Sequence, residues 1–126
     1  MRSGMLRAVG AATAGYGFAV AVRPAVLARP AGLVTPAGAV AEDTRLAVAP
    51  LGWRDAMSGL ALMAAPDGAP LALAALLRIA SDLGDAVLVG RRLRTRPRRW
   101  GTIATAVGWA ALTTAALLAP PVRPRS

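Results

Sequence analysis

Five charged side chains interrupt apolar stretches of this chain, and their types and spacing could support chemistry: Arg54, Asp55, Arg78, Asp82 and Asp85. We call these five residues the charge cluster. Three of them fall within residues 69–90, a run long enough to cross a membrane as a helix. They are spaced there by four and then three residues, which places their side chains on one helix face. Because charges within a membrane are costly, we expect the cluster to face the protein interior and to pair there.

The spacing of the cluster around a turn predicts two ion pairs between neighbouring helices. Arg54 lies fourteen residues before Gly68, and Asp82 lies fourteen residues after it. Two antiparallel helices joined at this turn would hold those two side chains at one depth, so we predict an Arg54–Asp82 pair. Asp55 falls between the levels of Arg78 and Asp82, and we therefore predict an Asp55–Arg78 pair.

One carboxylate of the cluster is in excess, because the cluster contains three Asp and two Arg. Asp85, one helical turn beyond the predicted pairs, is the candidate for this odd group. Charges that only neutralise one another would fix the register of the two helices, which is the least costly arrangement away from water. An unpaired carboxylate in a low dielectric would instead take up a proton or hold a cation. The cluster is therefore either a structural network or part of a proton or ion path.

A metal-dependent enzyme is the third interpretation, because Asp82 and Asp85 form a D-x-x-D pair and Asp oxygens suit Mg²⁺. The CDP-alcohol phosphotransferases open their site with D-x-x-D-G and add further Asp on the next helix. Here Ala86 follows Asp85, and residues 100–120 contain no acid. The chain also lacks Cys and His, which excludes thiol nucleophiles, disulfides, Cys/His metal sites and a Ser-His-Asp triad. We therefore expect no metal, no cofactor and no enzymatic activity.

The composition indicates that membrane helices position the cluster. Hydrophobic residues make up 56% of the 126 residues, and they are mainly Ala, Leu and Val. A soluble domain of this size would bury little area around an Ala-rich core, whereas small side chains let membrane helices approach closely. We predict an all-α polytopic membrane protein with four transmembrane helices in a single domain over residues 1–126.

Breaker residues divide the chain into these helices. Pro66-Asp67-Gly68-Ala69-Pro70 predicts a turn, and three prolines within residues 29–51 leave no room for a helix of membrane length. Trp53 and Trp100, at the starts of two apolar segments, are predicted to anchor them at the membrane interface. A cleaved signal peptide, with residues 8–22 as its apolar region, is the competing interpretation of the first segment. The predicted elements are helices over residues 5–28, 52–66, 69–90 and 100–120, a linker over 29–51 and a basic loop over 91–99.

The distribution of Arg predicts the orientation in the membrane. All fifteen basic residues are Arg, the net charge is +9, and six of the Arg lie within residues 91–99. Cytoplasmic loops are rich in such residues. A cytoplasmic 91–99 loop puts ten Arg inside and four outside, with both termini facing outward. The richness in Ala, Arg, Gly and Pro indicates a bacterial source, hence the inner membrane. Binding of nucleic acid or of a specific lipid is the alternative explanation of the charge, and we expect no nucleic-acid partner.

Two short motifs resemble a known family. Gly52-Trp53-Arg54-Asp55, followed by Ser58-Gly59-Leu60-Ala61, resembles the G-x-R-D…x-G-L-A pattern of small four-helix bacterial integral membrane proteins, a domain of unknown function. Residues 80–87 are similar to that family as well, and the resemblance extends over about residues 15–118. It implies a four-helix membrane protein with a recurrent Arg-Asp pair at the start of the second helix, and it implies no activity.

Two functions from different classes follow from the sequence. The first is a structural or interaction protein, whose charges set its own fold or bind a partner. The second is a small proton- or ion-coupled transporter, or a subunit of one, in which the surplus carboxylate works. The expected partners are the lipid bilayer and a membrane protein or a second copy of this chain.

Overall fold

The computed structural model describes residues 1–92 and 99–123, and within them the chain forms helices and no strands. The all-α prediction is confirmed. α2 is a single short turn of helix, so four long helices make up the fold. The elements are α1 (Ser3–Val22), α2 (Ala25–Ala28), α3 (Glu42–Ala64), α4 (Ala69–Arg92) and α5 (Arg99–Leu118).

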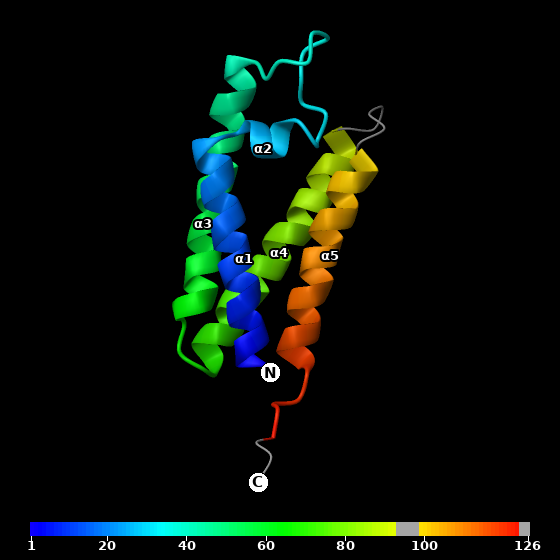
Figure 1. The fold of residues 1–126 in the computed structure, drawn as a ribbon. Coiled ribbons are helices and arrows are strands. Elements are labelled where there is room, and N and C mark those ends of the chain that lie inside the picture. Colours follow the sequence, from blue (N-terminus) through cyan, green and yellow to red (C-terminus); the bar gives the residue numbers. More distant parts are fainter. Residues whose placement is uncertain (93–98, 124–126) are drawn as a thin grey trace.

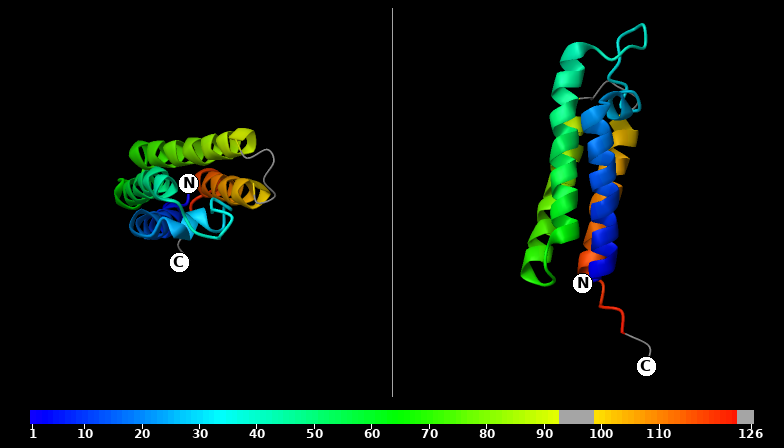
Figure 2. Two further views of the ribbon diagram at one scale, coloured as in Figure 1. Left: turned by 90° about the horizontal axis from the view of Figure 1, so that it is seen from above. Right: turned by 60° about the vertical axis from the view of Figure 1, so that its left-hand side comes forward.

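The four long helices run in antiparallel order, up and down, so both ends of the described chain lie at one end of the molecule (Figure 1). We call this the terminal end, and we call the opposite end, which carries α2 and the connection to α3, the linker end. α1 packs along α3 and α4 packs along α5, and the view from above shows these two pairs side by side (Figure 2). At the terminal end, the Arg2 N–H donates to the Ala116 carbonyl at 2.8 Å and links α1 to α5.

Glycines bring α1 and α3 into backbone contact. A Cβ atom on Gly17 would lie 2.3 Å from the Ala56 nitrogen, closer than real Cβ atoms approach. A Cβ atom on Gly59 would lie 2.5 Å from the Ala14 nitrogen. Only a residue without a side chain fits at these positions, and small residues at a helix interface permit this close approach in membrane proteins. The close packing of α1 against α3 therefore depends on glycines spread along the interface of the two helices.

A hydrophobic core joins the two helix pairs at the terminal end. It contains side chains from all four long helices, namely Leu6, Val9, Leu62, Leu71, Ala75 and Ala116. Toward the linker end, α4 leans away from α3 (Figure 1). The core therefore closes one end of the bundle, and polar side chains connect α3 to α4 above it.

The second long helix begins earlier than predicted. α3 starts at Glu42 rather than at residue 52, and Pro50 lies inside it. Proline removes one backbone N–H and usually ends a helix, but α3 continues through Pro50, which lies on an exposed face. Two acidic residues in the first turn, Glu42 and Asp43, also favour a helix start there. The predicted 29–51 linker is correspondingly shorter.

The first long helix ends earlier than predicted. α1 stops at Val22 instead of residue 28, because Arg23 precedes Pro24 and takes a non-helical conformation with φ −130° and ψ 82°. The short α2 occupies the remaining positions. The predicted helices over 69–90 and 100–120 correspond to α4 and α5 within two residues at each end. Most of the predicted basic loop, residues 93–98, lies outside the described residues.

Candidate functional site

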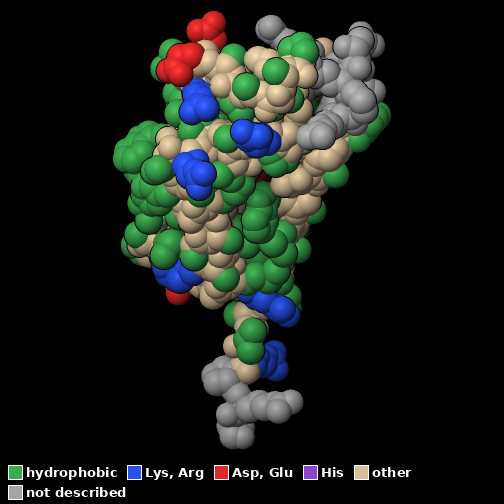
Figure 3. Space-filling model, turned by 45° about the horizontal axis from the view of Figure 1, so that its top comes forward, with side chains coloured by type: hydrophobic (Ala, Val, Ile, Leu, Met, Phe, Trp, Pro, Cys, Tyr) green, Lys and Arg blue, Asp and Glu red, His purple; other side chains and the backbone are tan. Residues whose placement is uncertain are grey.

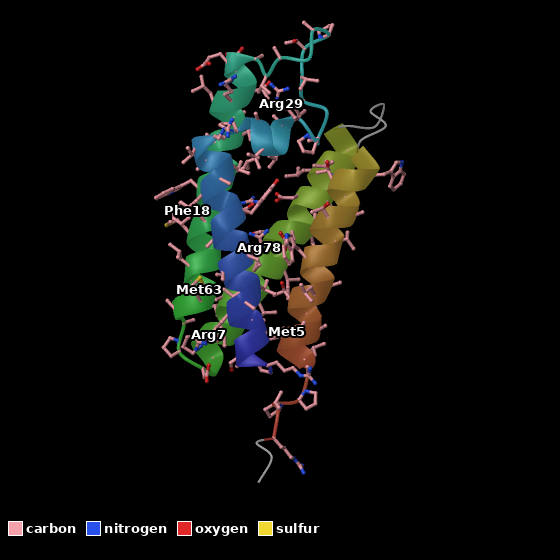
Figure 4. The ribbon with its side chains drawn as sticks, in the orientation of Figure 1. Met5, Arg7, Phe18, Arg29, Met63 and Arg78 are labelled. Atoms are coloured by element: carbon pink, nitrogen blue, oxygen red, sulfur yellow. The ribbon has the colours of Figure 1, made fainter. Side chains whose placement is uncertain are left out.

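The charge cluster forms one connected network between α3 and α4. The predicted Asp55–Arg78 pair is present, with Arg78 Nη1 donating to Asp55 Oδ1 at 2.9 Å. Figure 4 shows Arg78 at mid-height of the bundle. Its side chain is only 4% exposed. The guanidinium therefore sits away from solvent and needs acceptors on several sides.

Three groups surround the Arg78 guanidinium. Its Nε donates to Asp82 Oδ2 at 3.1 Å, and its Nη2 donates to Asp82 Oδ1, which makes a two-pronged pair within α4. The third group is Ser58, which was not among the predicted members of the charge cluster. Arg78 Nη1 donates to Ser58 Oγ at 3.1 Å, and Ser58 Oγ donates to the Asp55 carbonyl at 3.1 Å. Its position three residues after Asp55, on the same helix face, was the available signal.

The Arg54 guanidinium forms the other half of the network. Its Nη1 and Nη2 donate to the two oxygens of Asp85, at 3.2 and 2.6 Å, in the bidentate geometry that gives strong charge-assisted bonds. Nη2 also donates to Asp55 Oδ1 at 3.2 Å, so Asp55 is shared by both Arg residues. Arg54 Nε is buried and has no hydrogen-bond partner among the described residues. The sharing of Asp55 ties the two pairs into one unit.

The two halves of the network differ in exposure. The side chains of Arg78 and Asp82 are 4% and 3% exposed, whereas those of Arg54 and Asp85 are 39% and 36% exposed. The dry half lies nearer the terminal end, and the half-exposed half lies one turn closer to the linker end. The network therefore runs from the interior of the bundle to its surface.

Two predicted features of the cluster are wrong. Arg54 does not pair with Asp82, and Asp85 is not the carboxylate without a partner. Asp82 lies four residues from Arg78 on the same helix, so the nearest cation takes both of its oxygens. Because α4 leans away from α3, the long Arg54 side chain reaches Asp85 one turn further along instead. The network still contains one carboxylate more than it has guanidinium groups, and the Asp55 carboxylate accepts hydrogen bonds from both Arg residues.

The two tryptophans predicted as anchors lie on the outer surface. Trp53 is 55% exposed and Trp100 is 62% exposed. Trp53 was placed at a helix start, but α3 begins at Glu42, so Trp53 lies about 16 Å along the helix. There it packs edge-to-face on Phe18 of α1, with ring centroids 6.1 Å apart.

Exposed hydrophobic side chains and buried charged side chains occur together in this bundle. Large hydrophobic residues are exposed on every long helix, for example Phe18, Met57, Leu77 and Val107. Arg78 and Asp82 are buried in the same part of the bundle. On the face seen in Figure 3, charged side chains gather toward the two ends, and hydrophobic side chains lie between them.

Two helices of the described chain, Ser3–Val22 and Trp100–Leu118, are long and apolar enough to cross a membrane. α3 and α4 are longer, but they carry the charge cluster. Among the described residues, no group of three or more His, Cys, Asp or Glu side chains is arranged to hold a metal ion. The network can thus join helices and carry a surplus negative charge.

Comparison with protein-family models, with curated proteins and with solved structures gave no match to this chain. The resemblance to small four-helix bacterial membrane proteins therefore stays a prediction.

Proposed function

We propose that the chain is a non-enzymatic, four-span protein of the bacterial inner membrane, whose Arg/Asp network holds its helices together and faces a partner protein. The observation that carries this proposal is the distribution of side chains: exposed hydrophobic residues around buried, paired charges. In a bilayer, exposed apolar residues face lipid, and intramembrane charges are tolerated when they face the bundle interior and pair. In water, the same surface would expose apolar patches on all four helices.

The lengths of the helices agree with four spans. The long helices contain 20, 23, 24 and 20 residues, and about 20 residues cross a hydrocarbon core of roughly 30 Å. α3 and α4 are less apolar than the other two because they contain the network, whose charges are neutralised almost completely by one another. The backbone contact between α1 and α3 supports α1 as a permanent member of the bundle.

The positions of the Arg residues support an orientation with both termini outside. Arg23, Arg29 and Arg45 lie at the linker end, where α4 ends and α5 begins. Arg91 and Arg92 end α4 and Arg99 begins α5, so six Arg of the described residues lie at this end. Arg54 belongs to the network instead of this group. Three other Arg of the described residues lie at the terminal end or in the tail that follows α5, namely Arg2, Arg7 and Arg123. Under the positive-inside rule, the linker end is cytoplasmic.

The half-exposed Arg54–Asp85 pair supports an interaction role. It lies near the middle of α3, where lipid would meet a partly uncovered ion pair at considerable cost. A partner helix, from another membrane protein or a second copy of this chain, would cover it. Within the chain, the network joins α3 of one helix pair to α4 of the other, above the hydrophobic core.

A proton- or ion-coupled function is the second candidate, because three carboxylates share two guanidinium groups and the network runs from a dry pair to a half-exposed one. Such a path would use water, not a partner protein, at the Arg54–Asp85 side. Flux across vesicles containing the purified chain separates the two candidates.

The four-span topology is tested with single-cysteine variants, since the natural chain contains no cysteine. Ala69→Cys places a thiol at the α3–α4 turn, and Ala37→Cys places one in the linker. A membrane-impermeant maleimide added to spheroplasts should label Ala69→Cys and should label Ala37→Cys only after lysis. Labelling of Ala37→Cys in unbroken spheroplasts, or of both variants equally, would contradict the proposed topology.

A further inference from the structure

A groove at the linker end lies outside the charge cluster and its proposed role. It has a volume of about 710 Å³ and lies between the end of α1 and the first turns of α3. The groove forms because α1 ends at Val22, just before Pro24, whereas the first turns of α3, from Glu42 onward, extend beyond the end of α1. Its volume is within the range of small-molecule binding sites. The groove is open on one side, which in the proposed topology faces lipid.

The walls of the groove are apolar over most of their length. Along α3, Leu46, Ala49 and Trp53 recur at spacings of three and four residues and therefore line one helix face. Val22 and Pro24 form the opposite wall. From Arg45 to Trp53 the groove follows α3 for about 12 Å. An acyl chain lying along α3 would contact carbon atoms throughout that distance.

The outer rim of the groove carries two opposite charges, Arg45 and Glu42. Both side chains are exposed, and they form no ion pair with each other. Among the described residues, the Arg45 side chain makes one hydrogen bond, from Nε to the Val40 carbonyl at 3.3 Å. This bond leaves both Nη groups free to donate to an anion. Glu42 makes no side-chain hydrogen bond to a described residue, so its carboxylate is free to accept from a cation.

From the charged rim and the apolar walls, we infer that the groove is a binding site for a phosphatidylethanolamine lipid of the cytoplasmic leaflet. This headgroup carries a phosphate anion and a primary ammonium cation close together. The phosphate accepts from the Arg45 Nη groups, the ammonium donates to Glu42, and an acyl chain follows α3 to Trp53. A phosphatidylglycerol headgroup offers no cation to Glu42, and a phosphatidylcholine headgroup offers no N–H donor. The inference rests on the proposed membrane topology.

Tryptophan fluorescence tests the site in the full chain. Phe in place of Trp100 and Trp109 leaves Trp53 as a reporter of the groove, and Phe in place of Trp53 and Trp109 leaves Trp100 as a reporter of the bilayer. Both variants are reconstituted into vesicles containing a low, equal fraction of brominated phosphatidylethanolamine, phosphatidylglycerol or phosphatidylcholine. Bromine quenches a nearby indole. We expect brominated phosphatidylethanolamine to quench Trp53 most, and the three lipids to quench Trp100 alike.

Charge variants in the Trp53 reporter identify the groups responsible. Glu42→Gln should reduce the preference for phosphatidylethanolamine over phosphatidylcholine by about threefold, as expected for one exposed charge pair. Asp43→Asn, which removes the neighbouring charge outside the groove, should leave that preference unchanged. Arg45→Gln should weaken the quenching of Trp53 by phosphatidylethanolamine and by phosphatidylcholine, and Arg45→Lys should restore it.

Each other result overturns the inference in a recognisable way. Equal quenching of Trp53 by the three lipids, with Trp100 also quenched, would show ordinary bilayer contact and would leave the proposed topology standing. Stronger quenching of Trp53 by phosphatidylglycerol would assign the groove to an anionic lipid instead. Absence of quenching of both Trp53 and Trp100 would contradict the membrane topology and, with it, the lipid site.

Discussion

Removal of the Asp82 carboxylate should destabilise the protein much more than removal of the Asp85 carboxylate. Asp82→Ala takes both oxygens from a guanidinium that is 4% exposed and leaves Arg78 with only the shared Asp55 and a hydroxyl group. Loss of one partner from a buried pair costs about 3–5 kcal/mol. Since Asp55 still neutralises part of the charge, we expect about 3 kcal/mol, which is roughly a hundredfold change in the folding equilibrium constant.

Asp85→Ala is the matched control for this prediction. It removes the same group from the same helix, but the pair with Arg54 is 39% and 36% exposed. Because surrounding water or a partner screens such a pair, we expect a loss of about 1 kcal/mol or less. The double change Arg78→Ala with Asp82→Ala should recover part of the cost of Asp82→Ala, because no uncompensated cation remains.

The free energy of unfolding of these variants can be measured in mixed micelles by titration with a denaturing detergent, followed by circular dichroism. A cost for Asp85→Ala equal to or larger than that for Asp82→Ala would refute the assignment of a dry and an exposed half. A double variant as unstable as the sum of the two single changes would show that Arg78 and Asp82 do not interact.

Three further predictions use other parts of the molecule. Gly17→Ala should destabilise the α1–α3 contact by about 1–3 kcal/mol, because a Cβ atom at this position would overlap the backbone of α3. Gly15→Ala is the control and should not destabilise it, because a Cβ atom there meets nothing within 4 Å. Thermal unfolding in micelles compares the two variants. Arg7→Gln should change stability by less than about 1 kcal/mol in the same assay, since its pair with Asp67 is exposed at the terminal end. Asp85→Asn should leave proton flux in vesicles unchanged if the network is structural, and should abolish it if the network conducts protons.

The helix pattern could be predicted from the sequence where strong breakers surround an apolar run. The Pro66-Asp67-Gly68-Ala69-Pro70 turn fixes the start of α4, and Trp100 and Pro120 closely bound α5. The start of α3 could not be predicted, because Pro50 normally ends a helix and here lies on an exposed face. Whether a helix continues past a proline depends on how the rest of the helix packs, which the local sequence does not contain.

The membership of the charge cluster followed from residue types, but its pairing did not. Counting residues from Gly68 assumes that the axes of the antiparallel helices α3 and α4 stay at a constant separation. α4 leans away from α3, and the partner of Arg54 is therefore shifted by one turn (Figure 1). The attachment of Asp82 to Arg78 within α4 is an i,i+4 contact, which the spacing itself permitted. The role of Ser58 depends on the side-chain orientation of Arg78, and the spacing of three residues between Asp55 and Ser58 was its one signal in the sequence.

The accessibility of residue 77 tests most directly whether the charge cluster lies within the membrane. Leu77 precedes Arg78 on α4, and its side chain is 61% exposed on the outer face. Leu77→Cys, carrying a nitroxide label in reconstituted vesicles, should be relaxed strongly by oxygen, which dissolves in lipid, and weakly by a water-soluble nickel chelate. Ala37→Cys in the linker should show the reverse. Strong relaxation of the label at residue 77 by the nickel chelate would place α4 in water and would contradict the four-span bundle with its charges inside.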